Sequence, residues 1–494
     1  MIDSKQFIIT NKPFEKDDWC SLTLINGKIL SYHRGLHVCH NPDCSVLLLG
    51  HAWSVVSEEE LYSPYHFIES ASKDISEEDI IKEECHWCGR YIVIANNRIY
   101  LDTAGVLGVF YSPEVISSSL HVACTYLCIP MVYPDIKLKE NPDFVPGMQT
   151  TYPEIKRLLP SQVLHMDTLT YHTRPLLPEG IIKESTDKAQ IELLTKHYEC
   201  SLKNMSKEFY GQKIWLAITG GIDSRTVLAM LEKSGLPYQL FTLEHNHISD
   251  GDVIIPAMLA KTLKRTYRFI RRKGVRDNYR YKAYQTNCAG YAVDEDWIFH
   301  SYGQYEALLS NEKDHIVMIR SSVWGIPNEF YRRFNPDHYD ITKVFSGITK
   351  RPELYDNAMK WLEYVKGDNI NSGITLWNRT LWELRSGCWL SSIEQSLDII
   401  DNITSVQSCN CRLFLSILFG FDLQDRFSKK HEERITAYLC PSLKGIPYDY
   451  QNGYKFSFAF MKRKLKQLIK RATISAKYRV CLLASMMKRY CSKD

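Results

Sequence analysis

Two patterns of apolar and polar residues divide the chain. Before residue 180, short apolar segments alternate with Gly, Pro, Asn and Asp, which is typical of β-strands joined by turns. The clearest of these segments are residues 92–94, 122–125 and 163–166. After residue 186, apolar positions recur at helical spacing. We therefore expect a strand-rich part over 1–180 and a second, α/β part over 186–450.

The second part begins with alternating strands and helices. An apolar run over 214–218 ends at a pair of glycines, a helix is predicted over 225–231, and a strand over 238–243 precedes a helix near 253–264. A run that is apolar at every position suits a parallel strand buried on both faces. This order predicts a doubly wound parallel sheet. The remainder, to about residue 447, has a mostly helical pattern.

Composition adds three constraints. Hydrophobic residues make up 45% and charged residues 24% of the 494 residues, as in globular proteins with a sizeable core. No apolar run approaches the ~18 residues that span a bilayer, and the first residues resemble no signal peptide, so we expect a cytoplasmic protein. The 15 cysteines have no regular spacing and are expected to be mostly reduced.

The net charge of +4 is unevenly distributed. Residues 451–494 contain twelve Lys and Arg against one acid, and they predict a basic amphipathic helix. Such a helix is typical of a tail docked on its own domain, or of one that contacts an anionic membrane peripherally at its inner face. Few aromatic residues lie among the cations, which argues against single-stranded nucleic acid, so we expect no nucleic-acid partner.

A short loop with the sequence T-G-G-I-D-S joins the first strand of the second part to its helix. Gly220 and Gly221 let the backbone approach an anion, and their amides lie at the positive end of the helix. The hydroxyls of Thr219 and Ser224 extend this cradle, and Asp223 suits Mg²⁺. The loop predicts a site for the pyrophosphate of ATP with Mg²⁺. A Gly-rich turn without a ligand is the alternative.

This loop resembles the S-G-G-x-D-S signature of the PP-loop ATP pyrophosphatases, with Thr219 in place of the first Ser. Four upstream motifs follow the order of class II glutaminase domains and of the segment before a synthetase domain. These motifs begin at Gly89, Asp102, Phe110 and Ile155. Together with the loop, they make the chain similar to the asparagine synthetase-like family, and it also resembles β-lactam synthetases and lasso-peptide cyclases.

The resemblance implies a fold that is α/β and α+β. An N-terminal Ntn-type glutaminase-like β-sandwich with helices would occupy 1–180, followed over 186–450 by a PP-loop synthetase domain with a doubly wound parallel sheet and a largely helical C-terminal part. It also implies an AMP-forming carbon–nitrogen ligase that uses ATP and Mg²⁺ to adenylate a carboxylate, and an amine or ammonia then forms the amide. The acid would be a small molecule, such as a uronic acid, or a peptide that is cyclised. A homodimer is left open.

The same resemblance assigns roles to residues beyond the loop. Asn328 stands where the family has an Asp that binds Mg²⁺, and its amide oxygen can still coordinate the metal. Glu394, in a segment similar to the family's S-x-E-x-R helix, would orient or deprotonate the nucleophile. Lys429 or Lys430 would stabilise negative charge in the transition state. The ordinary alternatives are a solvated helix face for Glu394 and a charged surface run for the lysines.

Two other features bear on activity. Residue 2 is Ile, whereas class II glutaminases use an N-terminal Cys as nucleophile, so we expect no glutamine hydrolysis. Cys85 and Cys88 form a C-x-x-C, for which buried structural thiols are expected and a zinc site is the alternative.

Two functions compete with the ligase. One is a catalytically inactive relative that binds nucleotide and acts as a partner of another enzyme, which the neutral Asn328 favours. The other is tRNA modification, which the glutaminase-like half and the lack of a nearby catalytic Cys pair disfavour. Release of pyrophosphate upon addition of candidate acids separates the ligase from the inactive relative.

Overall fold

The computed structural model describes residues 4–130, 142–244, 248–271, 279–287, 295–309, 314–398, 400 and 402–448. Contacts divide the chain into two units, 1–446 and 447–494. The predicted basic tail lies outside the described residues, and the predicted boundary near residue 180 within the first unit stays a prediction. Among the described residues, no helix combines the length and the apolar character needed to cross a bilayer.

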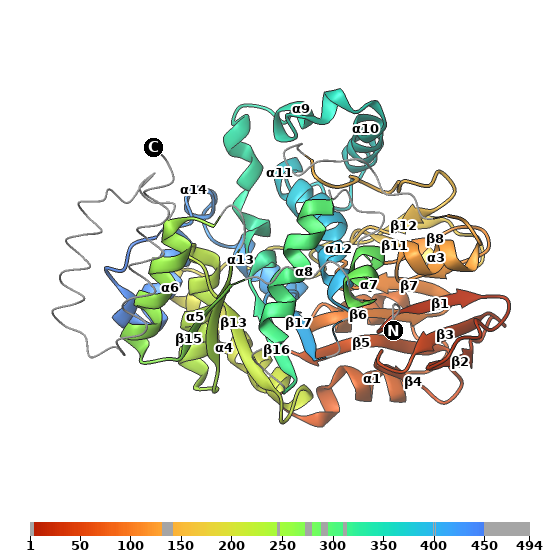
Figure 1. Cartoon of the computed structure of the whole chain (residues 1–494), viewed down its shortest axis with the longest axis horizontal. Helices are drawn as coiled ribbons and strands as arrows, with labels where there is room; N and C mark the ends of the chain where they lie inside the picture. The colour runs from red at the N-terminus through yellow and green to blue at the C-terminus, as the bar shows by residue number, and fades with distance from the viewer. Residues whose placement is uncertain are drawn as a thin grey trace. The chain divides into compact units, whose positions relative to one another are not determined.

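Two antiparallel sheets of six strands each form most of the structure before residue 180 (Figure 1). The first has the strand order β10-β8-β9-β1-β3-β2 and the second β12-β11-β7-β6-β5-β4. Their strands are β1 (Phe7–Thr10), β2 (Trp19–Thr23), β3 (Ile29–His33), β4 (Val38–His40), β5 (Val46–Ser54), β6 (Trp87–Ala95), β7 (Arg98–Leu101), β8 (Phe110–Tyr111), β9 (Ile116–Ser117), β10 (Lys156–Arg157), β11 (Gln162–His165) and β12 (Tyr171–Thr173). The strands predicted around residues 92–94 and 163–166 are confirmed.

One apolar core lies between these two sheets. It combines Phe7 and Leu30 of the first sheet with Leu47, Ile92 and Leu164 of the second. The other face of the second sheet is covered by α1 (Pro64–Ser70) and α2 (Glu77–Glu84), whose residues share a second apolar cluster with β5 and β6. The short helix η1 (Glu60–Tyr62) precedes α1.

The strand predicted over 122–125 is wrong, because this segment lies in α3 (Leu120–Tyr126). The Ser119 hydroxyl accepts a hydrogen bond from the amide of Val122 and caps the helix. The apolar residues of α3 pack with Ile8 and Phe110 of the first sheet. A four-residue apolar run has no periodicity that separates strand from helix, so the capping residue is the better signal.

A third sheet contains only parallel pairs, in the order β15-β14-β13-β16-β17. Its strands are β13 (Lys213–Ala217), β14 (Gln239–Leu243), β15 (Tyr267–Ile270), β16 (Ile316–Arg320) and β17 (Ile403–Gln407). The expected parallel sheet is confirmed, but the expectation of mostly helix beyond residue 264 missed β15, β16 and β17. The chain runs outward from β13 to β15 and then returns to place β16 on the other side of β13. The strand order therefore reverses between β13 and β16.

The third sheet is accompanied by helices and short helical turns. The longer ones are α4 (Asp187–Glu208), α5 (Ile222–Ser234), α6 (Asp250–Leu263), α7 (Tyr279–Asn287), α8 (Glu295–Leu309), α10 (Pro352–Lys366), α13 (Arg412–Phe419) and α15 (Lys430–Leu439). The shorter ones are η2 (Ser322–Asn328), η3 (Phe330–Phe334), α9 (Ile341–Val344), η4 (Ile348–Lys350), α11 (Leu376–Arg379), α12 (Ser391–Leu397), α14 (Leu423–Phe427) and η6 (Pro441–Leu443). A π-helix, η5 (Thr380–Leu390), continues from α11. Residues of α7, α8 and α12 form one apolar cluster with Trp215 and Met318 of the sheet.

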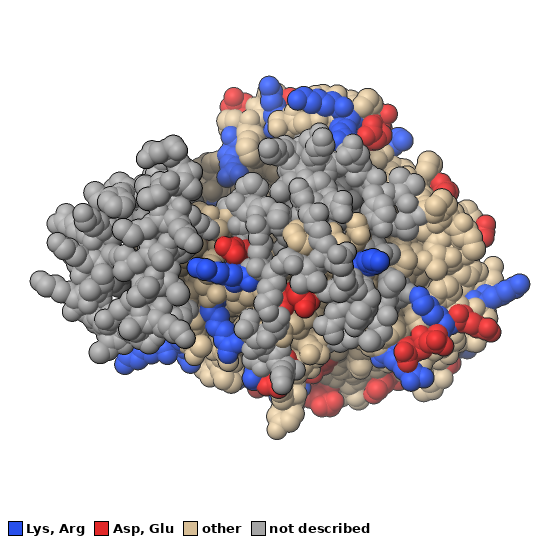
Figure 2. Space-filling model, viewed as in Figure 1, with Lys and Arg blue, Asp and Glu red and all other residues tan. Residues whose placement is uncertain are grey.

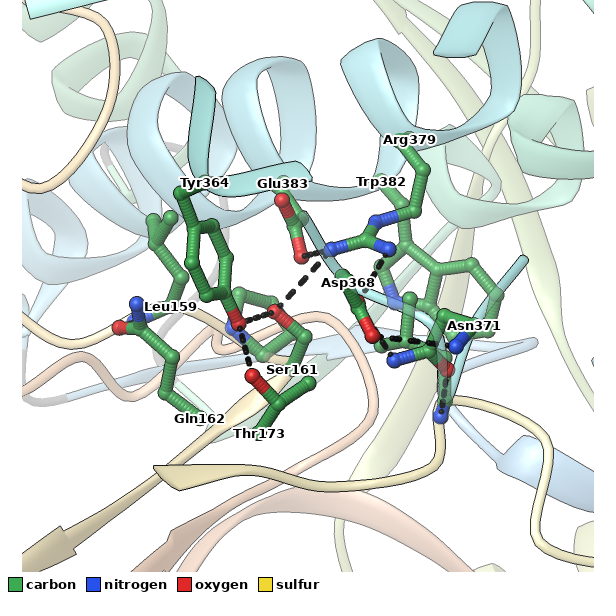
Figure 3. A network of polar contacts seen from close by, with 12 residues as sticks. Leu159, Ser161, Gln162, Thr173, Tyr364, Asp368, Asn371, Arg379, Trp382 and Glu383 are labelled. Carbon is green, nitrogen blue, oxygen red and sulfur yellow. Dashed lines mark hydrogen bonds and ion pairs between the residues drawn. The ribbon is translucent and has the colours of Figure 1, made fainter. Parts of the chain in front are cut away.

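A buried polar network centred on Arg379 links α11 to η5 and to the residue just before β11 (Figure 3). The guanidinium of Arg379 pairs with Asp368 at 2.7 Å and with Glu383 at 2.9 Å, and it donates to the Ser161 hydroxyl at 3.4 Å. Ser161 in turn hydrogen-bonds to the Tyr364 hydroxyl at 2.9 Å. These charged groups are removed from water, which is costly. Each of them therefore needs its ion-pair and hydrogen-bond partners to offset this cost.

Charged residues on the surface follow no single sign. On the face shown in Figure 2, Lys and Arg lie interspersed with Asp and Glu over the described residues. This agrees with the sequence, in which the excess of positive charge is confined to residues 451–494.

Candidate active site

The predicted loop follows β13 and leads into α5, with Gly221 as the residue before the helix. The Ser224 hydroxyl lies in the first turn of α5, where it accepts a hydrogen bond from the Thr219 amide at 3.1 Å and contacts the Thr219 hydroxyl at 3.2 Å. The Gly221 amide donates to the Thr219 hydroxyl at 3.2 Å. The structure therefore brings the predicted hydroxyls and amides together at the positive end of the α5 dipole.

Asp252 contacts this loop and was missed by the sequence analysis. The Gly220 amide donates to Oδ1 of Asp252 at 2.7 Å, and Asp252 lies in the first turn of α6. Ser249 caps α6 and also hydrogen-bonds to Oδ2 of Asp252 at 3.1 Å. The Gly220 amide thus already points at an anionic acceptor. The S-x-x-D pattern marks a helix start in the sequence, but it does not tell which loop the carboxylate reaches.

A cavity of about 570 Å³ opens beside the loop. Its lining residues are Asp143, Asp223, Ser322, Gly325, Asn328, Phe330, Tyr331, Phe334, Leu381, Arg385, Ser386, Trp389, Leu390 and Lys429. Asp223 follows β13 and η2 follows β16, so the cavity lies at the carboxyl ends of the two strands between which the strand order reverses. Open parallel sheets bind their ligands at this position. The volume is within the ~300–1,000 Å³ of small-molecule sites.

Lys429 forms an ion pair with Asp223 across this cavity lining, with 2.7 Å between Nζ and Oδ1. Burial opposes the charge of Lys429, but Asp223 and Glu432 outweigh burial and hold the pKa of Lys429 above its ordinary value. Its backbone is left-handed, with φ of 61°, a conformation that is uncommon for lysine and frequent at functional sites. Lys430 is exposed and does not line the cavity. Of the two lysines, the structure brings only Lys429 to the loop.

Asn328 lies at the end of η2, lines the cavity and is 2% exposed. Its Nδ2 donates to Oε1 of Glu432 at 2.8 Å, whereas its Oδ1 has no hydrogen-bond partner among the described residues. A buried oxygen without a partner is rare and fits a hard cation, which prefers oxygen ligands. Asp223 and Asn328 therefore fit the Mg²⁺ that the resemblance implies.

Glu432 was missed as a site residue, because it stands in a charged run that is typical of a protein surface. Its side chain is fully buried. Burial, together with the negative charge of Asp223, raises the pKa of Glu432 well above its ordinary value. Glu432 is thus not a surface residue, Lys429 is half-buried in the cavity lining, and Lys430 is exposed. Nothing in the local sequence separates Glu432 from the neighbouring Glu433.

Glu394 is not among the residues that line the cavity. All residues of α12 are buried, so the solvated helix face considered for Glu394 is wrong. Its Oε1 accepts hydrogen bonds from Arg320 and Gln407, each at 2.8 Å. These partners belong to the ends of β16 and β17. The predicted role of Glu394 toward the nucleophile stays a prediction.

The π-helix η5 supplies a wall of the cavity that the sequence analysis did not single out. The guanidinium of Arg385 lies 3.3 Å from the centre of the Trp389 ring and pairs with Asp143 at 3.4 Å. Long π-helical segments are rare and frequently occur at functional sites. The available signal was the density of Trp and Arg between residues 377 and 389.

The prediction of buried thiols for the C-x-x-C is confirmed. Cys85 and Cys88 are buried and unbridged, and burial raises the pKa of both thiols, that of Cys88 to about 12. Cys85 donates to the carbonyl of Lys82 at 3.0 Å. Cys85 does lie near His86 and Glu179, a group that could hold a metal ion, but Cys88 does not belong to that group. The described residues therefore do not form a zinc site from the C-x-x-C pair.

Comparison with known proteins does not identify the chain. No protein-family model and no curated protein sequence matches it. Among solved structures, it is similar to the NMN synthetase from Francisella tularensis, with 12% sequence identity and a TM-score of 0.19, covering 51% of this chain and 97% of that chain. A likeness at this TM-score carries no information about the activity of the chain.

Proposed function

We propose that the chain is an ATP-dependent, AMP-forming carbon–nitrogen ligase, which adenylates a carboxylate and transfers the acyl group to an amine or ammonia. The observation that carries the proposal is the convergence of Asp223, Asn328 and Lys429 on one cavity at the switch point of a parallel sheet. A phosphate cradle, oxygen ligands for a divalent cation and a nearby ammonium are the groups that transfer of an adenylyl group requires.

In the first step, the loop holds the pyrophosphate part of ATP. The amides of Gly220 and Gly221 and the hydroxyls of Thr219 and Ser224 would be its donors. The two amides now donate to Asp252 and to the Thr219 hydroxyl, so both would exchange these contacts for phosphate oxygens. A carboxylate oxygen of the acid attacks the α-phosphorus, and the bond from the α-phosphorus to the bridging oxygen breaks as pyrophosphate leaves. Mg²⁺, when bound, offsets the phosphate charge.

Lys429 and the metal ligands have separate tasks in this step. Asp223 and Asn328 would hold Mg²⁺, and Lys429 would then exchange its contact with Asp223 for the developing charge on the leaving group. A charged donor held beside the reacting groups stabilises the negative charge that develops in the transition state.

In the second step, the nitrogen of the amine attacks the acyl carbon. The carbon–nitrogen bond forms, the bond from the carbon to the AMP oxygen breaks, and the amine loses a proton. Asp143 is a suitable acceptor, because burial raises the pKa of this cavity-lining carboxyl group. Glu394 lies outside the lining, and its role toward the nucleophile remains part of the proposal.

The wider layout and the substrates belong to the same proposal. We propose that the two antiparallel sheets form the Ntn-type glutaminase-like sandwich and that the parallel sheet belongs to a PP-loop synthetase domain. A uronic acid or a peptide remains the proposed acid, and Arg385 with the rings of Tyr331 and Trp389 is available to bind it. The proposed location is the cytoplasm, with peripheral membrane contact through residues 451–494.

Two observations favour a second candidate, a nucleotide-binding relative without catalysis. The Gly220 amide already donates its hydrogen bond to Asp252, and the side chain of Asn328 carries no charge. Both features weaken the binding of Mg²⁺ and pyrophosphate unless Asp252 releases the amide and another carboxylate supplies charge.

Analysis of the products of ATP separates the two candidates. We expect the full chain, incubated with ATP, Mg²⁺, ammonium and a panel of uronic acids and unprotected peptides, to form AMP and pyrophosphate in equal amounts. Chromatography of the nucleotides and an enzymatic pyrophosphate assay measure both products. Formation must depend on one of the acids. ADP and phosphate as products would contradict the proposal, and ATP binding without turnover on any acid would favour the inactive relative.

A further inference from the structure

A buried carboxylate, Glu432, lies directly behind the cavity wall and has no task in the steps above. Its Oε1 accepts the hydrogen bond from Asn328, and its Oε2 has no hydrogen-bond partner among the described residues. A carboxylate oxygen that is buried without a partner is costly unless a cation or a proton binds to it. The position of Glu432 therefore points to a bound species that completes the site.

We propose that Glu432 is a third oxygen ligand of the cation held by Asp223 and Asn328, and that it supplies the negative charge that Asn328 lacks. This inference rests on the proposed function, since the cation is the Mg²⁺ of the ATP complex. Glu432 thereby removes one of the two weaknesses that favoured an inactive relative.

The orientation of Asn328 supports an oxygen-only site. Its Nδ2 is used by Glu432, so the atom that remains without a partner is the oxygen Oδ1. The same side-chain pair therefore presents two buried oxygens, Oδ1 of Asn328 and Oε2 of Glu432. Hard divalent cations such as Mg²⁺ take oxygen ligands of these two kinds.

The two acids at this place already attract a cation. The carboxylate of Asp223 acts on Glu432 directly, and both carboxylates stabilise the ammonium of Lys429. The Lys429 ammonium thus stands in for a metal ion among the same acids. When Glu432 gives up its proton as the cation binds, two carboxylates and one neutral amide match the charge of one divalent cation.

Binding of Mn²⁺, a paramagnetic substitute for Mg²⁺, tests this inference without any turnover. Free Mn²⁺ is measured by electron paramagnetic resonance during titration of the full chain in the presence of α,β-methylene ATP. Glu432→Gln keeps the size of the side chain, and we expect it to weaken Mn²⁺ binding at least about tenfold, as loss of a metal-site partner typically does. Glu433→Gln, the matched control on the next residue of α15, should leave Mn²⁺ binding unchanged. Wild-type affinity in folded Glu432→Gln would overturn the inference.

A charge exchange gives a second, independent result. The double variant Asn328→Asp, Glu432→Gln keeps the number of carboxylates, so we expect an affinity for Mn²⁺ close to that of the wild type. If Glu432 were not a ligand, the new Asp would add a carboxylate, and the double variant would bind Mn²⁺ much more tightly. That outcome contradicts the inference even if the single variant does not fold.

Failure of the inference differs from failure of the proposed function. Asp223→Asn should abolish Mn²⁺ binding if the loop forms a metal–nucleotide site at all. Retention of Mn²⁺ binding in Asp223→Asn would contradict the proposed function, whereas loss in Asp223→Asn with no effect of Glu432→Gln would contradict only the role of Glu432.

Discussion

Replacing Lys429 with methionine is expected to lower the rate of ATP–pyrophosphate exchange by about 10²–10³-fold, the loss typical for removal of one preorganised donor. Methionine keeps most of the apolar stem of lysine but removes the ammonium that contacts Asp223 at 2.7 Å. Because the pKa of Lys429 is raised above its ordinary value, the wild-type side chain is charged at neutral pH. Exchange of labelled pyrophosphate into ATP, in the presence of the acid found by product analysis, measures the effect.

Lys430 provides the matched control for this variant. Lys430→Met removes the same charge from an exposed position one residue along the chain, and exchange should stay at the wild-type rate. An equal loss of exchange rate in the two variants would mean that exchange depends on the net charge of this segment and not on Lys429 in particular. A folded Lys429→Met protein with full exchange would remove Lys429 from the mechanism.

Arg379→Met is expected to lower the free energy of unfolding by about 3–5 kcal/mol, the range measured when one partner of a buried ion pair is removed. The variant leaves Asp368 and Glu383 buried without their common counterion. Urea denaturation followed by tryptophan fluorescence measures the change. Because α11 continues into η5, the same loss should also loosen this wall of the cavity.

The ion pair of Lys213 is an exposed pair and serves as the control for the buried pairs of Arg379. This ion pair, with Asp314, is exposed on both sides, so Lys213→Met should change the free energy of unfolding by about 1 kcal/mol or less. If Arg379→Met were no more destabilising than Lys213→Met, the buried network would not have the structural role described for it.

The parts of the site that were predicted from the sequence are local. The loop could be recognised because an apolar strand, two glycines and a helix start follow each other within a few residues, and backbone geometry alone then fixes where Asp223 lies. The strand β16 was missed although Ile316–Arg320 is almost wholly apolar, because it follows a long stretch with helical spacing.

The parts that were not predicted depend on contacts between distant segments. The spacing of Lys429 and Lys430 could not select one of them, because the left-handed backbone at Lys429 decides which side chain faces the loop. The local sequence around Glu432 is typical of a charged surface. Its burial depends on a tertiary contact with Asn328, which is far away in sequence. The approach of Asp252 to Gly220 is likewise a tertiary contact between the starts of two helices.

The measurement that tests the central claim most directly is ATP–pyrophosphate exchange in Asp223→Ala, compared with the wild type and with Asp337→Ala. Asp223 lines the cavity beside the loop, whereas Asp337 is an exposed aspartate that does not line it. The account predicts acid-dependent exchange in the wild type and in Asp337→Ala, and no exchange in Asp223→Ala at an unchanged melting temperature. Undiminished exchange in folded Asp223→Ala would contradict the claim that this loop adenylates a carboxylate.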